Sequence, residues 1–575
     1  MKKVFFYLRP YVPRMTLGVT IKFVGTIMDL FLPWILSYLI DVIVPRENMG
    51  EILFYGFLML VCSVTAWAGN VIANRMASRV ARDTTQRLRH DLFQRISYLS
   101  CRQTDEFTIA SLESRLTTDT YNIHQMIGMM QRLGIRAPIL LLGGITMTMF
   151  MEPVLTLVLL AVLRIVAVTV FYISRRGIPL YTQLQQAVDR MVRVVRENAS
   201  GIRVIKALSK TEYEKERFRA ANQNIVEKET KASVTMAASN PLMNLFLNAG
   251  LTLVVVAGAF RVAAGQTQTG TILAFLTYFT IILNAMLSIN RMFMLFSKGS
   301  ASANRISQVL DAPEDLLLEA RDHQDTEYHV LFDHVSFAYH LGRSQVISDI
   351  SFALKKGETL GIIGATGCGK STIINLLIRF YDADKGTIRI DGDDVRGIPF
   401  SELHKKFGIV FQNDVLFADT VEENIRFGRN ITQEDIEKAV ACAQAQPFIE
   451  ELEDGLGYRL AIRGSNLSGG QKQRVLISRA LAAHPEILIL DDSSSALDYQ
   501  TDARLRQALS KNFRKTTTII VAQRASSIRH ADHILMLENG REIGYGTHEE
   551  LMASCEPYRQ ISLSQMGGET DEAHE

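Results

Sequence analysis

Apolar residues are concentrated in the first half of the chain, where they form long runs. Six of these runs come close to the ~20 residues that an α-helix needs to cross a bilayer. They lie near Thr16–Ile40, Ile52–Ala73, Gly134–Met151, Val154–Tyr172, Asn240–Gly258 and Thr271–Met292. Because few charged residues interrupt them, we predict six transmembrane helices.

The segments between these runs differ sharply in length. Three are short turns with few basic residues, whereas two, 74–133 and 173–239, are long and rich in arginine. Since positively charged segments stay on the cytoplasmic side, we expect both long segments and both chain termini in the cytoplasm. The chain is thus expected to be a multi-pass protein of the cytoplasmic membrane, in contact with lipid.

The two long segments contain good helix formers, scattered apolar positions and few breakers. They are expected to form helices that continue well beyond the bilayer. The alternative is that they form two independent cytoplasmic loops.

The second half of the chain has a different pattern. Short β-rich runs alternate there with helical runs, which is typical of an α/β domain. We predict four parts: a six-helix membrane domain (1–296), a linker (297–328), an α/β domain (329–567) and an acidic tail (568–575).

The amino-acid composition agrees with a chain that has one membrane part and one soluble part. Of the 575 residues, 47% are hydrophobic and 21% charged, which is too apolar for a disordered chain and too charged for one embedded throughout. The 62 basic and 60 acidic residues nearly cancel, so no nucleic-acid partner is indicated. The five cysteines have no zinc or disulfide spacing.

Residues 364–371, GATGCGKS, fit the phosphate-binding loop G-x-x-x-x-G-K-S between a strand-like run and a helical run. Its backbone N–H groups and the helix N-terminus would hold phosphate oxygens. Lys370 would neutralise the β- and γ-phosphates, and Ser371 would bind Mg²⁺. The residues expected to contact ATP are Gly364, Thr366, Gly367, Cys368, Gly369, Lys370, Ser371 and Thr372.

A second nucleotide-binding element follows downstream. The run Ile487–Asp491 is an apolar strand pattern that ends in a carboxylate. After a phosphate-binding loop, such a carboxylate typically holds Mg²⁺, partly through water. We therefore expect ATP and Mg²⁺ as cofactors, with Asp491 as a metal-site residue.

Between these elements lies Leu467-Ser468-Gly469-Gly470-Gln471. With this pentapeptide the sequence resembles the ATP-binding cassette (ABC) family, and the resemblance covers nearly the whole chain. It implies that Tyr339 stacks on adenine, that Gln412 senses the γ-phosphate and Mg²⁺, and that Ser495–Asp498 crosses a dimer interface. The six-span region resembles the exporter-type membrane domain, with Ser114–Asp119 and Glu197–Arg203 flanking the family's two coupling helices.

The resemblance also implies a dimer. In this family a second cassette supplies the signature to the open side of the γ-phosphate, so Ser468, Gly469, Gly470 and Gln471 would contact the ATP of a partner. One cassette and six spans make half of such a transporter. A second ABC half-transporter is therefore the expected partner.

Two positions depart from the family pattern. Asp492 stands where the family has the glutamate that polarises the attacking water, and Gln523 stands where it has the switch histidine. Aspartate falls short by about 1 Å, and such a misplacement can cost ~100-fold in rate. Glutamine cannot carry the positive charge that imidazole can. The pair resembles the degenerate-site subunit of bacterial heterodimeric multidrug exporters.

The leading hypothesis is an ATP-driven exporter half that moves an amphipathic or hydrophobic, drug-like or lipid-like compound. Two alternatives stay open: a homodimeric exporter in which Asp492 works as the base, and a regulatory ATP-sensing membrane subunit. Within the spans, Asp29 and Arg164 lie at membrane depth and either line the cargo pathway or pair with other helices.

Overall fold

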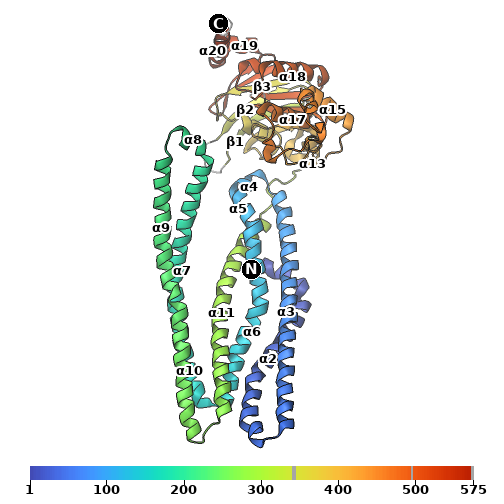
Figure 1. Ribbon diagram of the computed structural model, residues 1–575. Coiled ribbons are helices and arrows are strands. Elements are labelled where there is room, and N and C mark those ends of the chain that lie inside the picture. Colours follow the sequence, from blue (N-terminus) through green and yellow to red (C-terminus); the bar gives the residue numbers. More distant parts are fainter. Residues whose placement is uncertain (340–344, 494–495, 572–575) are drawn as a thin grey trace. The chain divides into compact units, whose positions relative to one another are not determined.

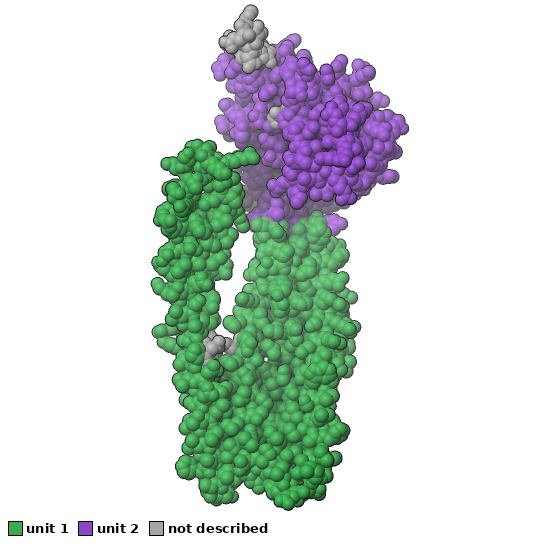
Figure 2. Space-filling model, in the orientation of Figure 1, with its two compact units in different colours: residues 1–97, 110–312 green, residues 98–109, 313–575 purple. Residues whose placement is uncertain are grey.

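We analysed a computed structural model of the chain, which describes residues 1–339, 345–493 and 496–571. The chain divides into two compact units, shown in Figure 2. Unit 1 comprises residues 1–97 and 110–312, and unit 2 comprises residues 98–109 and 313–575.

Unit 1 is entirely helical in its described residues. Six of its helical segments are long and apolar enough to cross a membrane, which confirms the six predicted spans. Its helices are α1 (Lys2–Leu8), α2 (Val12–Tyr38), α3 (Met49–Ser97), α5 (Ile109–Ser114), α6 (Thr120–Met151), α7 (Pro153–Ser200), α8 (Ile202–Ala207), α9 (Thr211–Ala237), α10 (Ser239–Ala263) and α11 (Thr269–Leu310).

Several of these helices are much longer than a bilayer is thick. Helix α3 has 49 residues and α7 has 48, so at ~1.5 Å per residue each exceeds twice the ~30 Å hydrocarbon core. Together with α9, which runs alongside α7 (Figure 1), they confirm that the two long arginine-rich segments are helical. Helix α11 also continues to Leu310, so residues 297–310, which we assigned to the linker, form its last turns.

The spans pack through large apolar side chains of α11. Phe275, Tyr278 and Phe279 are fully buried among residues of α2, α7 and α10. Helix α11 also lies along α6. Within this core the Tyr278 hydroxyl donates a hydrogen bond to the carbonyl of Leu30, which links α11 to α2.

Unit 2 contains two sheets, as expected for an α/β domain. A four-stranded antiparallel sheet has the order β2-β1-β4-β5, and a six-stranded sheet has the order β10-β9-β3-β8-β7-β6. The strands are β1 (Val330–Phe337), β2 (Ile347–Leu354), β3 (Thr359–Gly364), β4 (Lys385–Ile390), β5 (Asp393–Asp394), β6 (Phe407–Val410), β7 (Ile487–Asp491), β8 (Thr517–Val521), β9 (His533–Glu538) and β10 (Arg541–Gly546).

Helices cover the larger sheet. They are α12 (Lys370–Leu377), α13 (Phe400–Leu403), α14 (Val421–Arg426), α15 (Gln433–Cys442), α16 (Gln446–Glu450), α17 (Gly469–Leu481), α18 (Tyr499–Asn512), α19 (His548–Ser554) and α20 (Glu556–Asp571). Helix α20 includes residues 568–571, the first part of the expected acidic tail. The short helix α4 (Cys101–Phe107) also belongs to this unit.

The parallel strands bring the site residues together. Strand β7 is buried along its whole length and pairs with β8, so that Asp491 lies opposite Val521. Strand β3 pairs with the other side of β8 and ends at Gly364. The phosphate-binding loop, the Asp491-Asp492 pair and Gln523 therefore all follow carboxyl ends of neighbouring strands, where open α/β sheets bind ligands.

Candidate nucleotide site

A cleft of about 290 Å³ opens at this edge of the six-stranded sheet. It is lined by Val346, Thr366, Gly367, Gly369, Lys370, Ser371, Thr372, Gln412, Asp491, Asp492, Val521 and Gln523. Most of the residues that the sequence assigned to the ATP site thus meet in one place. Val346 and Val521 were not foreseen, because nothing in their local sequence marks them.

The phosphate-binding loop has the backbone that its glycines permit. Gly367 and Gly369 have φ angles of +85° and +101°, in the left-handed region that favours glycine. At Gly364, an added Cβ would lie 2.2 Å from the carbonyl oxygen of Leu537, so no larger residue fits. The ammonium of Lys370 donates to the carbonyls of Gly364 (2.8 Å) and Ala365 (2.9 Å), inside the curve of the loop.

Ser371 and Asp491, the two residues expected at the metal site, contact each other. The Ser371 hydroxyl donates to Asp491 Oδ2 at 2.9 Å. Burial raises the pKa of Asp491, and the hydrogen bond from Ser371 opposes that shift. A hydroxyl and a carboxylate are the hard oxygen ligands that Mg²⁺ prefers, so this pair fits a magnesium ion bound together with nucleotide phosphates.

The two unusual residues contact each other. Gln523 Nε2 donates to Asp492 Oδ2 at 2.8 Å, and Gln412 Nε2 lies 3.4 Å from the same oxygen. Asp492 has a φ of +52°, and its N–H donates to the carbonyl of Val521. The carboxylate at the position of the hydrolytic base is therefore held by neutral amide donors from the strand β8 end and from the loop after β6.

Three expected contact residues, Gly364, Cys368 and Tyr339, are not among the residues that line the cleft. The Cys368 thiol is buried in the core of unit 2, so only its backbone is available to phosphate. Tyr339 lies beside the phosphate-binding helix, with its hydroxyl 3.1 Å from Thr372 Oγ1 and its ring in an edge-on contact with Tyr381. Its role as an adenine platform stays a prediction.

The signature residues begin helix α17. The Ser468 hydroxyl accepts from the N–H of Gln471 at 3.3 Å, and Gln471 Oε1 accepts from the N–H of Ser468 at 2.9 Å. Ser468 and Gly469 are exposed. Among the described residues, those that line the cleft include none of Ser468–Gln471, so the signature does not close this chain's own site.

The expected interface loop precedes helix α18. Ser495 lies outside the described residues, whereas Ala496 contacts the signature: a Cβ on Gly470 would lie 3.1 Å from its carbonyl oxygen. Asp498 caps α18 by accepting from the N–H of Thr501 at 2.9 Å. The loop therefore supports the exposed start of α17.

Comparison with known proteins identifies the family of the chain. The ABC transporter transmembrane region family matches residues 15–286, and the ABC transporter family matches residues 347–495. An uncharacterized ABC transporter ATP-binding protein of Bacillus subtilis, YfiB, is 34% identical over the full length of both chains. The chain belongs to the ABC transporter family.

Further similarities support the same family and fold. The uncharacterized ABC transporter ATP-binding protein Rv1273c of Mycobacterium tuberculosis is 33% identical, with 97% of each chain covered. The solved structure of a bacterial Atm1-family ABC exporter with ATP bound superimposes with a TM-score of 0.79 at 23% identity, covering 96% of this chain and 98% of the other. This transporter therefore has the exporter fold.

Helix α4 was not foreseen as part of the cassette unit of this ABC transporter. Asp105 accepts a hydrogen bond from the Tyr381 hydroxyl at 2.6 Å, Gln103 Nε2 donates to the Pro313 carbonyl at 2.6 Å, and the Ser100 hydroxyl donates to Asp315 at 2.6 Å. Ser100 and Gln103 form a capping box. The Ser-x-x-Gln spacing in the sequence was the available signal for this helix start.

The structure shows polar partners for some of the charged residues within the spans. Arg136 of α6 forms an ion pair with Asp29 of α2 at 3.0 Å, and the Lys22 ammonium donates to Asn74 of α3 at 3.0 Å. Arg164 is exposed on α7. For Asp29, pairing between helices therefore explains a charge at membrane depth.

We expect Asp29→Leu to leave the Arg136 charge without its carboxylate and to destabilise the membrane unit. A charge at membrane depth costs about 2.5–3.5 kcal/mol. The double variant Asp29→Leu/Arg136→Leu should recover most of the loss. Melting temperature and yield of monodisperse protein in detergent measure both effects, and a single variant as stable as the double variant would contradict the pairing.

Proposed function

We propose that this ABC transporter is one half of an ATP-driven exporter of an amphipathic or hydrophobic, drug-like or lipid-like compound. In this proposal both termini and the cassette lie in the cytoplasm. The two long segments support this orientation because they are rich in arginine, and positively charged segments stay on the cytoplasmic side. ATP closes two cassettes on each other and turns the membrane helices outward. Hydrolysis then resets the transporter.

We further propose that the chain binds ATP and Mg²⁺ well but hydrolyses ATP poorly at its own site. The observation that carries this proposal is the contact between Asp492 and Gln523 at 2.8 Å within the cleft. The residues that we assign to phosphate and magnesium, namely Lys370, Ser371, Asp491 and Gln412, all line this cleft.

The requirements of ATP hydrolysis explain why this site is expected to bind ATP well but to hydrolyse it poorly. Attack by water on the γ-phosphate requires a carboxylate that reaches the water and a donor that stabilises charge on the phosphate. The Asp492 side chain is one methylene shorter than glutamate, and its Oδ2 accepts from Gln523. Gln523 in turn can donate one hydrogen bond but cannot become a cation.

The exposed signature supports a dimer, and the departures at Asp492 and Gln523 favour a heterodimer over a homodimer. Ser468 and Gly469 present a hydroxyl and N–H groups at the start of α17 to a partner. A partner with glutamate and histidine at the two positions would form the hydrolytic site with this signature. The homodimer is the second candidate, since a carboxylate, that of Asp492, does face the cleft.

Co-expression with candidate half-transporters tests the proposal. We expect one that carries glutamate and histidine to co-purify in a 1:1 complex, and inverted vesicles with the complex to accumulate an amphipathic fluorescent dye when ATP is added. Lys370→Ala on this chain should weaken ATP binding and reduce accumulation. Equal accumulation by vesicles that contain this chain alone would contradict the heterodimer and favour the homodimer.

A further inference from the structure

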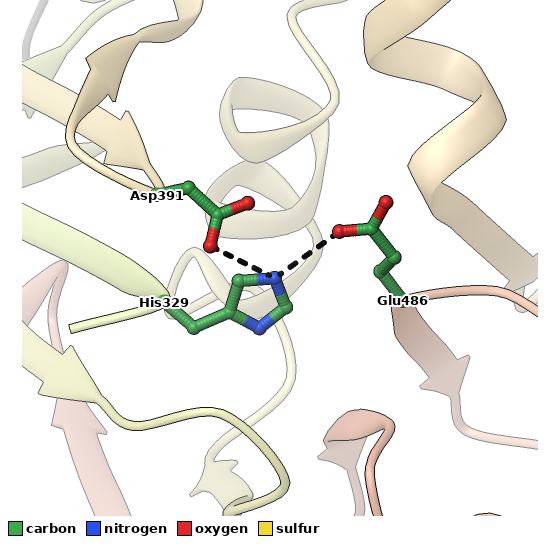
Figure 3. A group of neighbouring side chains, drawn as sticks. All are labelled: His329, Asp391 and Glu486. Carbon is green, nitrogen blue, oxygen red and sulfur yellow. Dashed lines mark ion pairs between the residues drawn. The ribbon is translucent and has the colours of Figure 1, made fainter. Parts of the chain in front are cut away.

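A buried histidine of the cassette unit faces two carboxylates far from the nucleotide cleft. His329 precedes β1, Asp391 lies in the turn between β4 and β5, and Glu486 precedes β7 (Figure 3). His329 Nε2 lies 3.7 Å from Asp391 Oδ1 and 3.8 Å from Glu486 Oε2. All three ligand atoms lie within 4.8 Å of one another.

The imidazole has an unsatisfied nitrogen. His329 is 2% exposed, and its Nε2 has no hydrogen-bond partner among the described residues. A buried polar atom without a partner costs about 1–3 kcal/mol. Figure 3 shows this nitrogen turned toward both carboxylates. At 3.7 and 3.8 Å, the two contacts are too long for hydrogen bonds.

The other ring nitrogen is fixed by the fold. His329 Nδ1 lies 2.6 Å from the Thr517 hydroxyl, which also accepts from the N–H of Gly357 at 3.0 Å. When Nδ1 carries the ring proton and donates to Thr517, Nε2 presents its lone pair to the carboxylates. Metal-bound histidines are oriented by such a hydrogen bond from the second nitrogen.

Backbone hydrogen bonds hold the three ligand residues in place. The N–H of Asp391 donates to the His329 carbonyl at 2.9 Å, and the N–H of Thr517 donates to the Glu486 carbonyl at 2.9 Å. His329 and Asp391 flank strands of the smaller sheet, and Glu486 flanks a strand of the larger one. The group therefore joins the two sheets through positions that the backbone already defines.

We propose that His329, Asp391 and Glu486 form a binding site for a divalent transition-metal ion, with zinc as the best fit. The bound ion would link the two sheets of the cassette. One imidazole and two carboxylates are ligands that zinc accepts at about 2.0–2.2 Å, with water in a fourth position. Tetrahedral ligands at that distance lie about 3.4 Å apart, so the two His329 contacts need to close by only a few tenths of an ångström.

This site is separate from the magnesium pair of the nucleotide cleft. Glu486 precedes the first residue of β7, whereas Asp491 is its last residue. Five residues of extended chain separate them by about 17 Å. A nitrogen ligand also favours zinc over Mg²⁺, which prefers oxygen ligands.

Lys406 competes with a bound cation. Its ammonium lies 3.0 Å from Asp391 Oδ2 and 3.1 Å from Glu486 Oε2. The two oxygens of Asp391 have different partners, since Oδ1 lies near His329 and Oδ2 lies near Lys406. In Glu486 the same oxygen, Oε2, lies near both His329 and Lys406. The lysine should therefore weaken metal binding, and Lys406→Met should strengthen it by about tenfold or more.

The site can be tested by titrating the full-length chain with Co²⁺ as the probe. The protein should carry no polyhistidine tag, should be stripped of metal with a chelator and should be kept without nucleotide. We expect one Co²⁺ per chain with the visible absorption bands of a tetrahedral N/O site, and displacement by Zn²⁺ with a rise in melting temperature. His329→Gln and Glu486→Gln should lose the bands, whereas the exposed control His334→Gln should keep them.

Two results would overturn the proposal. One is wild type without a Co²⁺ band, or with a band that survives both His329→Gln and Glu486→Gln. The other is Lys406→Met with unchanged or weaker affinity. Because Glu486 and Lys406 are partly exposed, their variants remain informative even where the buried His329→Gln fails to fold.

Discussion

Replacing Asp492 with glutamate and Gln523 with histidine should raise ATP turnover by the purified chain about 100-fold. Glutamate restores the ~1 Å of reach whose loss can cost that factor. Histidine restores a side chain that can carry positive charge near the γ-phosphate. Since Asp492 and Gln523 are hydrogen-bonded to each other, each single reversion should give less than half of the combined gain in free energy.

Phosphate release at saturating Mg²⁺-ATP measures this gain. We expect two copies of the reverted chain to complete each other's sites through Ser468–Gln471, so this measurement needs no second half-transporter. The matched control adds Lys370→Ala to the double reversion and should abolish the gain. A double reversion that leaves turnover unchanged would mean that Asp492 and Gln523 do not limit hydrolysis.

In the complex with a partner half, Gly470→Asp on this chain should reduce ATP turnover about 100-fold or more. The substitution places a carboxylate at the exposed start of α17, where the signature would meet the partner's γ-phosphate, and loss of comparable donors to a developing anion costs 10²–10³-fold. Asp492→Asn should cost far less, because we propose that this chain's own site contributes little hydrolysis.

The same complex supplies the controls. A Cβ at Gly470 lies 3.1 Å from the Ala496 carbonyl, so Ser468→Ala is the gentler companion variant and should show the same direction of change. Binding of a fluorescent ATP analogue to this chain's own cleft should persist in both signature variants. If Asp492→Asn proved the more damaging change, this chain's own site would be the hydrolytic one.

Much of the fold follows from patterns that are local in the sequence. The six apolar runs marked the spans, and GATGCGKS between a strand and a helix marked the β3–α12 junction. The fully buried strand ending at Asp491 also has a local signal, since the four consecutive apolar residues Ile487–Leu490 indicate a buried parallel strand.

Contacts between distant residues could not be predicted in this way. Asp492 and Gln523 stood out separately as unusual residues, but their hydrogen bond depends on the pairing of β7 with β8. The Asp105–Tyr381 contact joins positions 276 residues apart. Nothing in the local sequence marked His329, because Asp391 and Glu486 lie near it only through the arrangement of the two sheets.

The most direct test of the account is the fate of ATP on the lone chain, reconstituted in liposomes. We predict that nucleotide bound after incubation with Mg²⁺-ATP is recovered as ATP, with phosphate release far below the ~1–10³ s⁻¹ that is typical of enzymes. Brisk release at about 1 s⁻¹ or faster, with ADP as the bound nucleotide, would contradict the claim that this chain holds ATP without efficiently hydrolysing it.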